Sequence, residues 1–234
     1  MKKINSLLFV ITLLFASALQ AQTADEIIAK HIEAIGGREK ISQVKSIYSE
    51  VSMEVMGNQA PVTEYMLEGK GFKSETDFNG SKIISCFTDK GGWAINPMAG
   101  GTSAQPMPEE IYKAGKGQIY AGGALLDYTT KGYSVELAGK EGNNYKLKVT
   151  DGTSSSDYFI DPATYYLVKL VTKGEMMGQP VEVVTTFSDY KKTDFGIVLP
   201  YTRAIDLGSF SLTAKVNKVE VNKEIDPKIF EQPK

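Results

Sequence analysis

Residues 72–88, FKSETDFNGSKIISCFT, predict a β-hairpin and indicate the fold class of this chain. Over residues 72–78, the charged side chains Lys73, Glu75 and Asp77 alternate with Phe72, Ser74, Thr76 and Phe78, which is the period of two expected for a strand. Asn79 and Gly80 follow directly, and both tolerate the positive φ that a type I′ turn requires. Residues 81–88 return as a second strand. This stretch therefore predicts antiparallel sheet.

The same alternation continues along most of the chain, from residue 46 onward. Strands are predicted at residues 46–55, 62–68, 72–78, 81–88, 93–96, 133–137, 144–150, 156–161, 166–173, 181–188, 198–205 and 210–221. In the last of these the apolar facing changes, so we expect a β-bulge near Asn217 and Lys218, where one extra residue restores it. The predicted fold class is mainly β (α+β), with about eleven strands.

Two stretches interrupt the strands. Residues 23–35 predict an N-terminal helix, in which Thr23 and Glu26 form a capping box before one apolar face. Residues 97–126 form an insert rich in Gly, Pro and Met, with a weak helix over residues 109–120. A long insert of this kind is more typical of a lid than of a plain connector. The alternative is that its apolar side chains simply close one end of the core.

The first 21 residues have the pattern of a signal peptide. Lys2 and Lys3 precede an apolar run, which is shorter than the about 20 residues of a spanning helix. Cleavage is expected after Ala18 or Ala21, and neither position leaves a cysteine for lipid attachment. We therefore expect an exported protein that is not lipidated and has no stable membrane anchor. An exported location excludes nucleic acid as a partner. After cleavage, residues 22–234 are expected to form a single domain.

Composition argues against several kinds of site. The 26 basic and 28 acidic residues give a formal charge of −2, which is too mild for a field of one sign, and no basic stripe is present. The single cysteine, Cys86, rules out an intramolecular disulfide and is expected to pack as a small hydrophobe. The single histidine, His31, is expected to be a packed, hydrogen-bonded residue on the apolar helix face. One histidine and one cysteine cannot assemble a zinc site of the His/Cys type, so no metal is predicted.

No catalytic residues and no cofactor are predicted, and the chain is not expected to be an enzyme. The sequence has no glycine-rich phosphate loop after a strand and no calcium loop. An enzyme that uses a carboxylate pair, Glu109 with Glu110 or Asp189 with Asp194, is the weakest hypothesis. These acids lie in turns or at a helix start, where solvation is the expected state.

Methionine and aromatic side chains around the insert instead predict an apolar ligand site. Methionine is flexible and polarizable, so it can line a cavity that accepts acyl chains of different shapes. The predicted ligand-binding residues of the cavity and its lid are Met53, Met66, Phe87, Trp93, Ile95, Met98, Met107, Ile111, Tyr112 and Leu126.

Several motifs together resemble a known family. The most specific is DKGGWAINP at residues 89–97, and the others are ADEIIAKHIEAIGGREKI (24–41), DYFIDPATYYLVKL (157–170), TFSDYKKTDFGIVLP (186–200) and EIDPKIFEQP (224–233). In this order they resemble an exported branch of the outer-membrane lipoprotein carrier (LolA-like) superfamily of periplasmic proteins. The resemblance implies a strongly curved antiparallel sheet, an incomplete β-barrel, closed over a hydrophobic cavity by the N-terminal helix and a helical lid.

The resemblance also implies a function. It predicts a soluble, monomeric periplasmic protein that binds or carries an acylated lipoprotein or lipid, with an envelope membrane protein as a further partner. The alternative is an envelope protein-interaction or sensor module whose cavity is packed shut. Purified protein that contains lipid favours the first, and one stoichiometric protein partner without lipid favours the second.

Overall fold

The structure is a computed structural model, and it describes residues 22–233 apart from 56, 79, 153 and 177–178. The predicted signal peptide and the turn residue Asn79 lie outside the described residues. The helices are α2 (Ala24–Ala34), α3 (Arg38–Ile41) and α4 (Glu109–Gly115), with short 3-10 helices η1 (Pro97–Ala99), η2 (Lys116–Ile119) and η3 (Pro227–Phe230). Among the described residues, none of the helices has both the length and the apolar character needed to span a bilayer.

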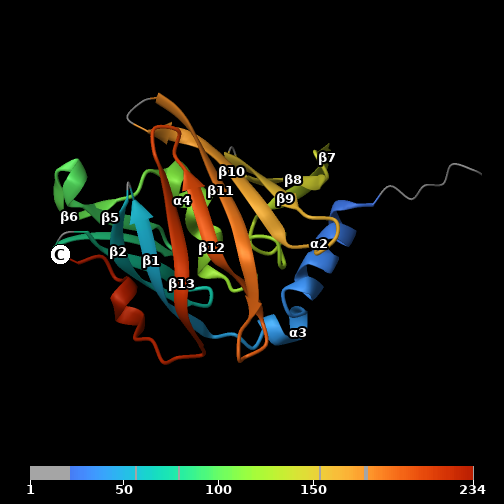
Figure 1. The fold of residues 1–234 in the computed structure, drawn as a ribbon, viewed down its shortest axis with the longest axis horizontal. Coiled ribbons are helices and arrows are strands. Elements are labelled where there is room, and N and C mark those ends of the chain that lie inside the picture. Colours follow the sequence, from blue (N-terminus) through green and yellow to red (C-terminus); the bar gives the residue numbers. More distant parts are fainter. Residues whose placement is uncertain (1–21, 56, 79, 153, 177–178, 234) are drawn as a thin grey trace, which may run out of the picture.

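Thirteen strands, counted over the described residues, form one antiparallel sheet (Figure 1). They are β1 (Ser46–Val55), β2 (Asn58–Leu67), β3 (Gly71–Phe78), β4 (Ser81–Thr88), β5 (Gly92–Asn96), β6 (Gly101–Pro106), β7 (Ser134–Glu141), β8 (Asn144–Asp151), β9 (Ser154–Ile160), β10 (Leu167–Met176), β11 (Gln179–Lys192), β12 (Val198–Asp206) and β13 (Ser211–Val221). The sheet is curved and unclosed, so the predicted incomplete β-barrel is confirmed.

Strand order places β6 and β7 at the two edges of the sheet. The order runs from β6 back to β1, crosses from β1 to β13, and then runs down to β7. Because β6 ends at Pro106 and β7 begins at Ser134, residues 107–133 must pass from one edge to the other. We call residues 107–133 the edge connection. The topology itself therefore brings this segment across the open side of the sheet.

The sequence predicted about eleven strands; twelve of the thirteen observed strands overlap a predicted range, and β6 is the strand that was missed. It pairs with β5, with Trp93 opposite Pro106. It lies within the stretch that was predicted as lid, residues 97–126. Its sequence, GTSAQP, shows no alternation of apolar and polar residues. β6 lies at a sheet edge, where the successive residues Thr102 and Ser103 are both exposed, so the strand has no buried face that such a pattern would reveal. Pairing with β5, rather than the side-chain pattern, makes it a strand.

Two local predictions are confirmed. Glu50 lies opposite Lys218 and Val51 opposite Val216, so Asn217 is the extra residue of a β-bulge. At the start of α2, the Glu26 amide donates to the Thr23 hydroxyl oxygen at 3.2 Å. The Thr23 amide donates to the Glu26 carboxylate at 3.0 Å, which completes the capping box.

The largest core cluster lies between α2, α3 and the strands nearest to them. Ile27 and Ile32 of α2 are buried in it, together with Leu147 of β8 and Ile160 of β9. In Figure 1, α2 and α3 lie at the end of the molecule away from β5 and β6. The N-terminal helix therefore closes one end of the curved sheet and leaves its middle to the edge connection.

Candidate functional site

The register of the strands decides which side chains face the cavity. Residues directly opposite each other in an antiparallel pair point to the same face. Ile47 lies opposite Met66, Met66 opposite Phe72, and Phe72 opposite Phe87. Ile47, Met66 and Phe72 line the cavity, so this row defines the cavity face of the sheet. The neighbouring row, which includes Cys86 opposite Trp93, defines the outer face.

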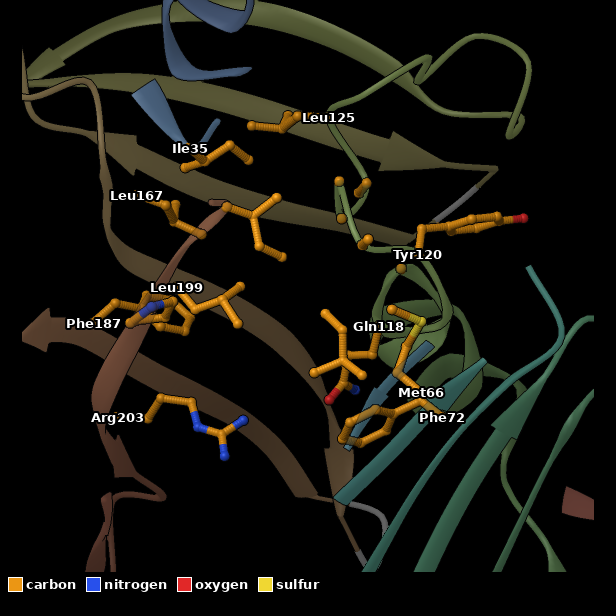
Figure 2. A pocket seen from close by; sticks show the side chains of 18 of the residues that line it. Ile35, Met66, Phe72, Gln118, Tyr120, Leu125, Leu167, Phe187, Leu199 and Arg203 are labelled. Atoms are coloured by element: carbon orange, nitrogen blue, oxygen red, sulfur yellow. The ribbon is translucent and has the colours of Figure 1, made fainter. Parts of the chain in front are cut away.

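A cavity of about 360 Å³ lies between the cavity face and the segments that cover it (Figure 2). Its strand side chains are mostly apolar or aromatic: Ile47, Met66, Phe72, Tyr158, Leu167, Leu170, Phe187, Tyr190, Leu199, Val216 and Val219. In Figure 2, Met66 and Phe72 face Leu199 and Phe187 across it. Ile35, after α2, and Leu125, in the edge connection, lie at the end near α2. This volume is in the range of about 300–1,000 Å³ for small-molecule sites.

The edge connection forms its wall of the cavity largely from small residues. Ala114, Gly115, Gly117, Ala121, Gly122, Gly123 and Ala124 all line it. A Cβ on Gly115 would lie 2.2 Å from a ring carbon of Phe87, and one on Gly122 would lie 2.5 Å from Leu126 Cβ. Glycine at these two positions therefore lets the backbone approach the sheet and the core closely.

Hydrogen bonds hold the edge connection to the β2–β4 part of the sheet and to itself. The Tyr112 hydroxyl donates to the Thr88 carbonyl oxygen at 2.8 Å, and the Ala121 amide donates to the Glu68 carboxylate at 2.7 Å. Lys131 donates to the Gly123 carbonyl oxygen at 2.8 Å. Burial raises the pKa of Glu68 and lowers the pKa of Lys131. The segment is thus fastened to the β2–β3 turn, to β4 and to itself.

His31 is the buried histidine that the sequence predicted, and it also lies at the cavity. Its Nδ1 is 2.8 Å from the Tyr165 carbonyl oxygen. Because that oxygen can only accept, Nδ1 carries the proton of the neutral ring. Burial lowers the pKa of His31, opposed in part by this hydrogen bond. The neutral imidazole therefore adds no charge to the cavity.

Two of the residues that line the cavity form an ion pair. Arg203 of β12 and Glu64 of β2 both line the cavity, and Arg203 Nη2 is 2.6 Å from Glu64 Oε1. β1 and β13 lie between these two strands in the sheet, so the pair reaches across both. It places two opposite charges among cavity walls that are mostly apolar or aromatic.

Of the ten predicted ligand-binding residues, Met66 lines the cavity and the other nine do not. Met53 shares the cavity face, since it lies opposite Ala214, which lies opposite Arg203. It packs farther along, against Val51 and Val62.

Three of the others lie near the cavity wall. The Phe87 ring lies close to Gly115, and Leu126 is buried in the main core. Tyr112 is half-buried and fastens the edge connection through its hydroxyl.

The remaining predicted residues lie on the outer face, near the β5–β6 edge or in solvent. Trp93 and Ile95 pack on the outer face, where the Trp93 ring nitrogen donates to the Phe230 carbonyl oxygen at 2.9 Å. Met107 lies beside Gly92, while Met98 and Ile111 are exposed. Trp93 had been placed in the cavity because it precedes the insert, but the register turns it to the other face. The role of the ten residues in binding stays a prediction.

Sequence reasoning missed the far wall of the cavity and its ion pair. Phe187, Leu199 and Arg203 come from β11 and β12, far in sequence from the insert that suggested the site. Residues 198–205 did contain an indication of this site. Arg203 and Leu199 are four residues apart in one predicted strand, so their side chains point to the same face of the sheet. A charged residue at an inward position of a strand is the pattern that would have found it.

The four acidic residues of the carboxylate-pair hypothesis lie outside the cavity. Glu109, Glu110, Asp189 and Asp194 are all exposed, and none lines the cavity. The described residues contain no cluster of three His, Cys, Asp or Glu side chains that could hold a metal. Cys86 is fully buried, and burial raises the pKa of its thiol to about 12, so the thiolate is scarce at neutral pH.

An open antiparallel sheet with a helix and a crossing segment over an apolar cavity defines a class of β-rich proteins with an interior pocket. The chain has the fold of LolA superfamily proteins. A LolA superfamily protein from Nitrosomonas europaea matches with a TM-score of 0.58 and 11% identity, over 90% of this chain and 98% of that one. A putative outer membrane lipoprotein-sorting protein domain from Vibrio parahaemolyticus matches with a TM-score of 0.54 and 12% identity, over 87% and 95%.

A DUF1329 family protein from Desulfovibrio piger also has this fold, with a TM-score of 0.57 and 15% identity, over 88% of this chain and 96% of that one. No family model and no curated protein matches the sequence. The likeness therefore concerns the fold, and it extends over nearly the whole described chain.

Proposed function

We propose that this protein binds acyl chains, of a lipid or an acylated lipoprotein, in the cavity under the edge connection. The observation that carries the proposal is the cavity of about 360 Å³ with apolar walls from both halves of the sheet. Burying an acyl chain there contributes about 0.8 kcal/mol per CH₂ group. The fold shared with a lipoprotein-sorting domain supports the same ligand class.

The proposed cellular role follows from the predicted location of the protein. Residues 1–21 would direct export, with cleavage after Ala18 or Ala21, and residues 22–234 would work as one soluble, unlipidated domain in the periplasm. A carrier in that compartment would shuttle its acylated cargo between membranes and contact an envelope membrane protein. We expect it to act as a monomer and not as an enzyme.

Native mass spectrometry of the protein purified from its own envelope tests the proposal. Wild type is expected to carry a lipid or acyl adduct that is released by organic solvent. Leu199→Trp places a larger side chain where Figure 2 shows Leu199 entering the cavity, and it is expected to abolish the adduct. Lys215→Trp, at an exposed position of the neighbouring strand β13, is the matched control and is expected to keep it.

Two results would count against acyl binding. The first is a wild-type protein that carries no adduct and binds no added acyl compound. The second is an adduct that survives in Leu199→Trp, because the lipid would then lie elsewhere. Capture of one stoichiometric protein partner by lipid-free protein would favour the sensor or interaction module instead.

A further inference from the structure

The ion pair on the cavity face offers more than a structural contact. The side chains of Arg203 and Glu64 are 23% and 15% exposed, and both line the cavity. In Figure 2, Arg203 extends from β12 toward the side where Met66 and Phe72 lie. A polar group that is held among apolar cavity walls is well placed to contact the polar part of an amphiphilic ligand.

Arg203 has a hydrogen-bond donor that no described residue of the protein accepts from. Its Nη2 is engaged by Glu64, but its Nε is buried and has no hydrogen-bond partner among the described residues. A buried donor without an acceptor destabilises the protein that contains it. A ligand oxygen that accepts from Nε would remove this penalty on binding.

The charge of the pair decides which kind of oxygen fits. The Arg203 guanidinium and the Glu64 carboxylate cancel, so the site has no net charge to offer an anion. A ligand carboxylate or phosphate at Nε would lie near Glu64 and add an uncompensated charge in an apolar cavity. The carbonyl oxygen of an ester or amide can accept the hydrogen bond without adding charge.

We therefore infer that the ligand is a neutral acyl ester or acyl amide whose carbonyl oxygen accepts a hydrogen bond from Arg203, and that free fatty acids are disfavoured. The hydrocarbon chain would lie along the apolar walls, with Glu64 holding the guanidinium in place. This inference rests on the proposed acyl binding and names the chemical class of its ligand.

Displacement of a neutral fluorescent probe, N-phenyl-1-naphthylamine, by three C12–C13 compounds tests the inference on delipidated protein. The compounds are methyl laurate, laurate and tridecane. Wild type is expected to bind methyl laurate about tenfold more tightly than laurate, because the laurate carboxylate would bring an uncompensated charge into the apolar cavity. This comparison needs no variant, so it remains decisive even if a cavity variant fails to fold.

Two variants then locate the effect. Glu64→Gln/Arg203→Met removes both charges together, because Arg203→Met alone would leave a buried carboxylate unpaired. The double variant is expected to bind methyl laurate about tenfold more weakly than wild type and to bind tridecane with unchanged affinity. Glu64→Gln keeps the guanidinium and removes its counter-charge, so laurate is expected to gain affinity and the preference to reverse. Lys218→Met, which removes an exposed ion pair with Glu220, is the control and is expected to change none of the three.

The outcomes separate the inference from the proposed function. Wild type that binds laurate as tightly as methyl laurate overturns the inference and leaves acyl binding intact. The same holds if the double variant retains its affinity for methyl laurate. Wild type that binds none of the three compounds overturns acyl binding itself, and the inference with it.

Discussion

The indole nitrogen of Trp93 donates a hydrogen bond to the carbonyl oxygen of Phe230 at 2.9 Å, on the face of the sheet opposite the cavity. Trp93 is 4% exposed there, packed with Cys86 and the C-terminal segment. Trp93, the single tryptophan of the sequence, therefore holds the C-terminal segment against the outer face of the sheet.

The first prediction concerns this tryptophan as a spectroscopic reporter. Because Trp93 is the single tryptophan and faces away from the cavity, adding methyl laurate is expected to leave its emission maximum unchanged. Phe230→Ala, which removes its cover, is expected to shift the emission to longer wavelength and to destabilise the protein by about 3–5 kcal/mol. An emission shift on ligand addition as large as that of Phe230→Ala would show that the outer face responds to the ligand.

The second prediction concerns the close approach of the edge connection to β4. Gly115→Ala places a Cβ against the Phe87 ring, so either the ring or the segment must move. We expect a loss of about 1–3 kcal/mol in the free energy of unfolding and weaker acyl binding, measured by urea denaturation and probe displacement. Gly101→Ala in β6 meets no atom closer than 3.6 Å and is the control. Equal effects of the two substitutions would contradict the packing at Gly115.

The third prediction concerns pH. Burial lowers the pKa of His31 in the folded state below its ordinary value of 6.5, so the unfolded chain takes up a proton first as pH falls. The stability that neutral His31 contributes is therefore complete above about pH 6.5 and decreases on acidification below it. Urea denaturation between pH 8 and pH 5 is expected to show this decrease in wild type. His31→Asn keeps a donor near the Tyr165 carbonyl oxygen and is expected to flatten the profile between pH 6.5 and 5; an unchanged profile would assign the effect to other groups.

The fourth prediction concerns the fastening of the edge connection. Tyr112→Phe removes the hydrogen bond to the Thr88 carbonyl oxygen and is expected to cost about 1 kcal/mol. Hydrogen exchange of residues 109–126 should become faster, while exchange in β1 and β13 should stay the same. Tyr48→Phe, which removes a hydroxyl that donates to Glu50, is the control away from the cavity. Unchanged exchange in residues 109–126 would mean that Glu68 and Lys131 hold the segment without Tyr112.

The sequence by itself determined the features that depend on neighbouring residues. Alternating side chains predicted most of the strands, because a strand with one buried face repeats every two residues. The capping box of Thr23 and the bulge at Asn217 followed from local hydrogen bonding and from side-chain parity. The antiparallel fold class and the buried states of His31 and Cys86 followed in the same way.

Only the tertiary structure decided which face of each strand points into the cavity and which side chains contact each other across the sheet. Parity within one strand gives two faces but not which of them is inward, and the pairing register turned Trp93 outward while it kept Met66 inward. Strand order put β6 and β7 at opposite edges, which carried residues 107–133 over the opening. The curvature of the sheet brought Arg203 to Glu64 across two intervening strands, a contact between residues far apart in the sequence that no local pattern encodes.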